Sequence, residues 1–303
     1  MDNSLNNELL KAIDQGNLEK IKYHLASIDV DIQNEIDWIV RSASYNGYLE
    51  IIKYVVSLGA NIRTLDDYAF RMASRNGHLD VVKYLVSLGA DINAEDNYAI
   101  VEASMFGHLE VVKYLVLLGA NISESLTWAS SNGHLEVVKY LISVGADIHE
   151  NNDNAVQWAS SYGYLEVVKY LVSIGANIRS KNDISVQCAA SNNHLTVVKY
   201  LVSIGADIRN DNDAAIQWAS LHGHLEMVKY LVSLGSDTSR ICENHSKYIA
   251  FCQKMEEKRR HWAAKKIYYW WIPICYDLNR ECGQRMKHKN LDKAKELGYE
   301  FSN

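Results

Sequence analysis

The sequence predicts an all-α protein in which pairs of short helices stack into one continuous solenoid. Three observations support this fold class: a sequence motif, here called the phrase, that recurs at a fixed interval, apolar residues at helical spacing inside each copy, and a glycine after each helical stretch. The phrase is clearest at residues 77–92, Gly-His-Leu-Asp-Val-Val-Lys-Tyr-Leu-Val-Ser-Leu-Gly-Ala-Asp-Ile. A period close to thirty residues is typical of solenoid proteins.

The interval between copies is 30 residues at every step but one. The first glycine of the phrase stands at Gly47, Gly77, Gly107, Gly133, Gly163 and Gly223. Asn193 replaces it in one copy, and the step from Gly107 to Gly133 is 26 residues. A degenerate first copy surrounds Gly16. The sequence therefore predicts eight units in residues 1–238.

The second half of each unit predicts an amphipathic helix. In the copy at residues 77–92, Leu79, Val82 and Leu85 share one face at helical spacing. An acidic residue stands at the start of most of these helices and a lysine follows three residues later, which suits the helix dipole and ion pairing along the helix. Gly89 suits the left-handed backbone that ends a helix.

The first half of each unit predicts the antiparallel partner helix. It begins after a side chain that can cap free amide groups: Asp37, Asp67, Asn97, Ser123, Asp153, Asp183 or Asp213. Small residues such as Ala103 and Ser104 allow helices of neighbouring units to approach closely. Gln157, Gln187 and Gln217 are expected to bridge adjacent units by hydrogen bonds. Because two such helices bury too little apolar surface alone, stacking supplies the core.

The phrase Gly-His-Leu-Glu-Val-Val-Lys-Tyr-Leu, followed by Gly-Ala-Asp-Ile, closely resembles the second half of the ankyrin repeat. The first half departs from that family, because no unit contains Thr-Pro-Leu-His and Pro273 is the sole proline. Each unit is also about three residues shorter than the family's period, in the segment that carries a β-turn finger. The resemblance implies an ankyrin-type helix-turn-helix solenoid over residues 1–238, with shortened or absent β-fingers. In the fifth unit Ile122 runs directly into Ser123, which deletes four more residues.

Tyrosine-rich, shortened copies and the closing phrase at residues 266–276 are similar to the ankyrin-repeat proteins of giant DNA viruses. This resemblance implies a viral protein that binds a protein partner, a host protein included, in the host cytoplasm. The absence of a secretion signal and five thinly spread cysteines also favour an intracellular compartment with reduced thiols. We expect a monomer.

Charge divides unevenly along the chain. Residues 1–235 carry a net charge of −11, and residues 236–303 carry +5. An acidic body argues against a nucleic-acid partner, since binding to phosphates needs cationic side chains. The basic end leaves an acidic partner open for that segment.

Large side chains recur at one position of the first helix, namely Met72, Glu102, Trp128, Trp158, Cys188 and Trp218. In ankyrin proteins this face borders the concave groove, so the resemblance implies a partner-binding site there. Tryptophan and tyrosine often anchor protein interfaces. The predicted site consists of Trp128, Trp158 and Trp218, with Phe106, Tyr162 and His222 toward the edge of the groove. The alternative is that each tryptophan only fills the space left by the missing finger. The two interpretations stay open at this point.

No enzyme, cofactor or metal site is predicted. The chain contains no phosphate-binding glycine loop and no Gly-x-Ser-x-Gly motif. One histidine per repeat recurs at His78, His108, His134, His194 and His224. Neighbouring repeats lie roughly 10 Å apart, and zinc needs ligand atoms about 2 Å away, so these histidines cannot converge on one ion. The Cys242-x-x-His245 spacing in the last segment is a weak zinc signal.

Residues 239–303 break the period and contain ten of the 30 aromatic residues. We expect a helical C-terminal cap that covers the last repeat. Alternatively, the basic residues around Trp262 form an amphipathic helix for an acidic protein or membrane surface. A third interpretation is an adaptor that recruits a ubiquitin ligase or another effector, although no Leu-Pro-led F-box start is present. The longest apolar run, residues 267–276, is about half of a membrane span. The function that follows is a non-enzymatic scaffold for protein–protein interaction.

Overall fold

A computed structural model describes residues 3–27 and 33–236 of the chain. These residues form sixteen helices joined by turns, with no strand among them, so the prediction of an all-α solenoid is confirmed. Turns stand where ankyrin proteins carry β-fingers, as the short period predicts. The predicted C-terminal cap at residues 239–303 lies outside the described residues.

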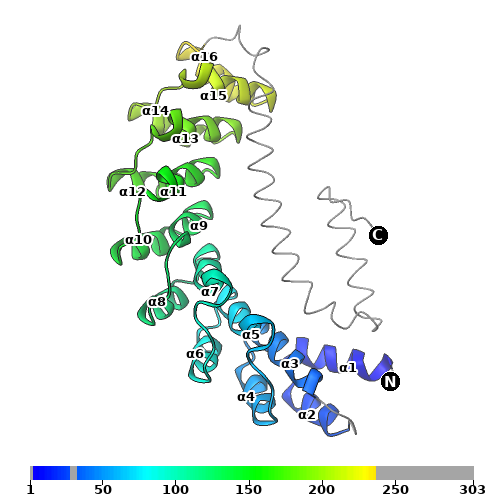
Figure 1. Ribbon diagram of the computed structural model, residues 1–303. Coiled ribbons are helices and arrows are strands. Elements are labelled where there is room, and N and C mark those ends of the chain that lie inside the picture. The colour runs from blue at the N-terminus through cyan, green and yellow to red at the C-terminus, as the bar shows by residue number, and fades with distance from the viewer. Residues whose placement is uncertain (1–2, 28–32, 237–303) are drawn as a thin grey trace. The chain divides into compact units, whose positions relative to one another are not determined.

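The helices follow one another in eight pairs (Figure 1). The first helices of the pairs are α1 (Asn3–Asp14), α3 (Gln33–Asn46), α5 (Thr64–Arg75), α7 (Ala94–Met105), α9 (Ser125–Ser131), α11 (Glu150–Ser161), α13 (Ser180–Ser191) and α15 (Asn210–Leu221). The second helices are α2 (Leu18–Ala26), α4 (Leu49–Ser57), α6 (Leu79–Ser87), α8 (Leu109–Leu117), α10 (Leu135–Ser143), α12 (Leu165–Ser173), α14 (Leu195–Ser203) and α16 (Leu225–Ser233).

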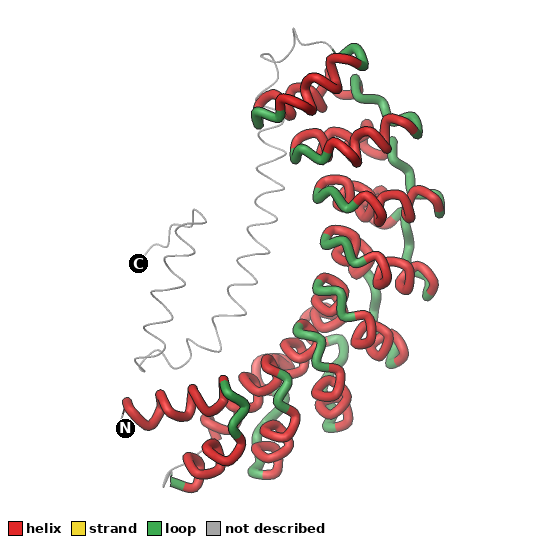
Figure 2. Tube along the Cα trace, turned by 180° about the vertical axis from the view of Figure 1, so that it is seen from behind, coloured by secondary structure: helices red, strands yellow, loops and turns green. Residues whose placement is uncertain are grey.

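The described residues divide into two compact units. The first ends at Leu65, and the second runs from Asp66, inside α5, to the end of the described chain. In the second unit the odd-numbered helices form one row and the even-numbered helices another (Figures 1 and 2). We call these, with the turns that lead into them, the odd row and the even row. Consecutive helices pack more closely in the odd row than in the even row.

Apolar side chains of the even row supply much of the core. In α6 the residues Val81, Val82 and Leu85 are buried, and the same three positions are buried in α8, α10, α12 and α14. Leu79 is half-buried, so the buried face is turned slightly from the one predicted. The odd row contributes small buried residues such as Ala103 and Ser104, which allow close packing between repeats.

Five of the recurrent glycines lie against a ring of the following repeat, namely Gly16, Gly77, Gly107, Gly133 and Gly163. Gly107 has a φ of 77°, and a Cβ there would lie 2.4 Å from Nδ1 of His134. The imidazole of His134 donates from Nε2 to the carbonyl oxygen of Met105, at 2.9 Å. Tyr48 makes the same kind of bond in the first unit, from its hydroxyl to the carbonyl oxygen of Asp14 at 3.0 Å. The recurrent ring therefore joins one repeat to the next.

Stability should fall on mild acidification, because burial lowers the pKa of His108, His134 and His194 below the ordinary value. The unfolded chain then binds more protons than the folded chain. The contribution of the neutral imidazoles is fully present above about pH 6.5, the unfolded value, and is lost as the pH falls below it. Urea midpoints are expected to be lower at pH 5 than at pH 7.5.

Replacing these three histidines by tyrosine, the residue found at Tyr48 and Tyr164, gives the matched control. Tyrosine keeps a ring and a donor but does not titrate in this range. The triple variant should lose part of the pH dependence. An unchanged pH dependence would show that other groups cause it.

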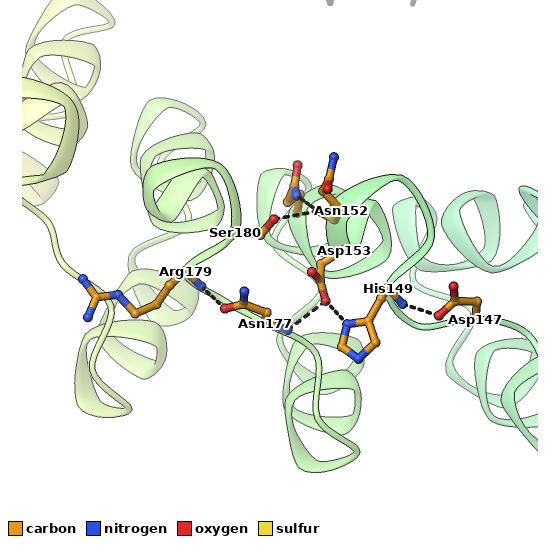
Figure 3. Close-up of polar contacts among 8 residues, drawn as sticks. Asp147, His149, Asn152, Asp153, Asn177, Arg179 and Ser180 are labelled. Carbon is orange, nitrogen blue, oxygen red and sulfur yellow. Dashed lines mark hydrogen bonds and ion pairs between the residues drawn. The ribbon is translucent and has the colours of Figure 1, made fainter.

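Left-handed backbone begins most helices of the odd row. Three consecutive residues with positive φ occur at 95–97, 151–153, 181–183 and 211–213. The aspartate that ends the turn reaches the next repeat: Asp153 Oδ1 accepts from the backbone N–H of Asn177 at 2.8 Å (Figure 3). Asp183 Oδ1 likewise accepts from the N–H of Asp207 at 3.0 Å. These aspartates therefore link repeats, whereas the sequence predicted that they cap their own helices.

The glutamine prediction is confirmed only in part. Gln157 Oε1 accepts from Lys181 Nζ of the next repeat at 3.4 Å. Gln217 instead donates from Nε2 to the carbonyl oxygen of Asn212, at 2.6 Å in its own repeat. Gln157 makes the same bond within its own repeat, to the carbonyl oxygen of Asn152, so the left-handed turn holds both amide groups and Gln157 adds the bridge through Lys181.

Candidate functional site

The six residues predicted to bind a partner all lie on the odd row of the second unit. Trp128, Trp158 and Trp218 belong to α9, α11 and α15. Phe106, Tyr162 and His222 immediately follow α7, α11 and α15. One position therefore repeats along the row, and a second position four residues later lies beside it.

Their exposure to solvent differs. Trp218 is only 6 % exposed and belongs to the core. Trp128, Trp158 and Tyr162 are half-buried, and Phe106 and His222 are exposed. The packing interpretation thus describes Trp218, while the other aromatic side chains expose part of their surface to solvent.

Trp158 and Tyr162 form a stacked pair. Their ring centroids lie 5.8 Å apart with an interplanar angle of 15°. The ring centroids of Trp218 and His222 lie 5.9 Å apart, and the two ring planes are tilted by 38°. Stacking of this kind holds both rings in one orientation.

A buried ion pair replaces the tryptophan at the α5–α7 junction. Glu102 occupies the tryptophan position, has no exposed surface, and lies 3.2 Å from Arg75 Nη1 through its Oε2. The Arg75 guanidinium lies 4.7 Å from the centroid of the Phe106 ring. Arg71, 1 % exposed, lies 5.1 Å from the centroid of Tyr98. Burial, reinforced by the charge of Glu102, raises the pKa of the Tyr98 hydroxyl.

This cluster was not predicted from the sequence. The sequence contains two indications of it. Glu102 stands at the position that holds tryptophan in other repeats, and the preceding repeat contains two arginines, Arg71 and Arg75. A lone glutamate in a column of large apolar residues indicates either exposure or a buried partner. The described geometry shows the second case.

No group of three or more histidine, cysteine or acidic side chains that could hold a metal ion occurs within residues 3–27 and 33–236. Cys188, a half-buried free thiol, is the single cysteine of this part of the chain. The pattern that begins at Cys242 lies outside the described residues. Among the described helices, none combines the length and the hydrophobicity that a membrane span requires.

Comparison with known families gives a match to the model described as Ankyrin repeats (3 copies), at residues 9–96, 99–182 and 180–241. No curated protein matches the chain. Many solved structures do, among them the crystal structure of human ASB11 ankyrin repeat domain. That match is 23 % identical, has a TM-score of 0.55, and covers 63 % of this chain and 96 % of the other. At this identity the similarity establishes the fold alone.

Proposed function

Because the chain belongs to the ankyrin-repeat family, we propose that it is a non-enzymatic scaffold that binds a protein partner along the odd row of the second unit. Ankyrin repeats generally mediate protein–protein interaction, and solenoids offer extended surfaces for it. We choose this surface on one observation. Half-buried and exposed aromatic rings follow one another along it at Phe106, Trp128, Trp158 and Tyr162.

These rings suit a protein interface for two reasons. Large aromatic side chains bury much area with few rotatable bonds, and they dominate the energetic centres of interfaces. The stacked Trp158 and Tyr162 are also held in place by their own helix. The even row also carries one half-buried tyrosine per helix, such as Tyr114 and Tyr140, besides single exposed apolar side chains near helix ends, such as Leu88. Its tyrosines stand beside lysines of the same row, since Lys83 and Lys199 lie over the rings of Tyr114 and Tyr230.

From the resemblance drawn from the sequence to ankyrin-repeat proteins of giant DNA viruses, we also propose a host protein as the partner and the host cytoplasm as the compartment. The chain would act there as a monomer. The alternative function, an adaptor that recruits a ubiquitin ligase or another effector through residues 239–303, depends on a segment outside the described residues. The experiment below separates the two functions.

The test replaces Trp158 by Met and Tyr162 by Asn in the full chain. Methionine and asparagine stand at the corresponding positions Met72 and Asn192, so each change is compatible with the fold. The variant should capture at least about tenfold less of each protein that the wild-type chain binds, which corresponds to a loss of roughly 1.4 kcal/mol in binding free energy. Quantitative mass spectrometry of the captured proteins measures this, with circular dichroism to confirm unchanged helix content.

Leu117→Ser is the matched control on the even row. Leu117 is 81 % exposed, and serine occupies the corresponding position at Ser87 and Ser143. Capture by this control should equal that of the wild type. Equal capture by the Trp158 and Tyr162 variant would contradict the proposal, and ligase subunits recovered with both variants would favour the adaptor.

A further inference from the structure

We infer that the partner presents an extended basic segment to α7, α9 and α11. This inference rests on the proposed function, since it names the chemistry of the segment that the same surface binds. It follows from where the second unit places its charges and from the aromatic side chains beside them.

The even row is nearly neutral. In α8, α10, α12 and α16 a lysine pairs with the glutamate three residues earlier, at 2.7 Å in each case. The remaining lysines, Lys83 and Lys199, lie over the rings of Tyr114 and Tyr230 at 5.9 and 5.6 Å. The even row therefore leaves little unbalanced charge for a partner.

The odd row holds the negative charge of the second unit. Residues 66–236 contain nineteen acidic and eleven basic residues, a net charge of −8. Between Tyr84 and Ile178 the only Lys and Arg residues are Lys113, Lys139 and Lys169, all on the even row. The turns before α7, α9 and α11, together with the first turns of α7 and α11, carry exposed or half-exposed acidic side chains at Asp91, Glu95, Asp96, Glu124, Asp147 and Glu150.

Glu124 ties these carboxylates to the aromatic row through the backbone. It is the residue before α9, and the N–H of Trp128 donates to its carbonyl oxygen at 3.0 Å, so the acidic turn leads directly into the turn of α9 that carries Trp128. The carboxylate of Glu150 accepts from the N–H of Glu124 at 3.4 Å, which brings the acidic turns of α9 and α11 together. A guanidinium or ammonium group placed there meets carboxylates and a π face, both of which attract cations.

Basic residues mark the end of this surface. Lys181 Nζ lies 3.2 Å from the carbonyl oxygen of Asn151 and 3.1 Å from Oδ1 of Asn154, so α13 covers the turn of α11 with a positive charge. Arg179, whose Nε lies 3.5 Å from Oδ2 of Asp183, and Arg209 are the exposed basic residues of the following turns. The acidic surface therefore spans the three repeats that begin with α7, α9 and α11.

The spacing of the repeats sets the spacing of the basic residues. Packed helices of neighbouring repeats lie roughly 10 Å apart. Three residues of extended chain also span about 10 Å. A segment with Arg or Lys at every third position would place one cation at each of the three turns.

The probe is a labelled peptide of four Arg-Ser-Ala copies, and fluorescence anisotropy measures its binding to the full chain. The test variant combines Asp96→Asn, Glu124→Gln and Glu150→Gln. The matched control combines Glu110→Gln, Glu136→Gln and Glu166→Gln, which makes the same change in net charge on the even row. The test variant should bind at least about tenfold more weakly at 0.15 M salt, whereas the control should change less than about twofold.

Equal weakening by both variants, or no binding by the wild-type chain, would overturn the inference. Binding that appears only after Lys254, Lys258, Lys265 and Lys266 are changed to Gln would also overturn it, since the occupant would then be the chain's own basic segment. None of these results depends on Trp158 or Tyr162. A failure here therefore leaves the capture experiment, and with it the proposed function, to be judged separately.

Discussion

Gly107→Ala is expected to lower the free energy of unfolding of the repeats by about 2–5 kcal/mol. The φ of 77° costs a residue with a Cβ roughly 1–2 kcal/mol. The new Cβ would also lie 2.4 Å from Nδ1 of His134, and forced repacking of this kind costs about 1–3 kcal/mol. Urea denaturation followed by circular dichroism measures the loss.

Gly223→Ala separates the two costs. Gly223 has nearly the same φ, 74°, but no described atom lies within 4 Å of a Cβ built there. This variant should lose only the backbone contribution. Removing the ring in a Gly107→Ala/His134→Ala variant should make Gly107→Ala as mild as Gly223→Ala. Equal losses in the two single variants would show that the contact with the next repeat does not determine the cost.

The positions of the helices could be predicted because each rests on local chemistry. The 3.6-residue spacing of apolar side chains places α6 and its equivalents, and Gly89 and Gly107 adopt the left-handed backbone that ends a helix. The acidic residue and lysine predicted on most second helices form the observed ion pairs in four repeats of the second unit. None of these features requires knowledge of a neighbouring repeat.

The left-handed turns could not be predicted, because the hydrogen bonds of their aspartates are made with another repeat. An aspartate such as Asp153 can cap its own helix or accept from another backbone group, and its sequence neighbours fit both. The choice depends on the N–H of Asn177, twenty-four residues later, which the solenoid brings within 2.8 Å. Local sequence carries no information on that approach.

The candidate site was predictable as a column of residues but not as a surface. Trp158 and Trp218 occupy the same position of their repeats, yet one is half-buried and the other is 6 % exposed. The side chains around each tryptophan decide how much of its ring meets solvent. The partner-binding role of the column remains a prediction.

Arg75→Met is expected to destabilise the repeats by about 3–5 kcal/mol, because it leaves the carboxylate of Glu102 fully buried without the guanidinium 3.2 Å away. Methionine suits the site sterically, since Met105 stands at the corresponding position of the next repeat. The urea midpoint measured at pH 7.5 should fall accordingly.

Combining Arg75→Met with Glu102→Met should restore most of that stability. Met72 is fully buried at the position that corresponds to Glu102, and an apolar replacement of a buried ion pair is often neutral or stabilising. A double-mutant cycle in which the two changes simply add, within about 0.5 kcal/mol, would contradict this account. Recovery would show that packing can replace the ion pair. The pair would then matter for how it holds Arg75 against Phe106, at the end of the aromatic row, rather than for net stability.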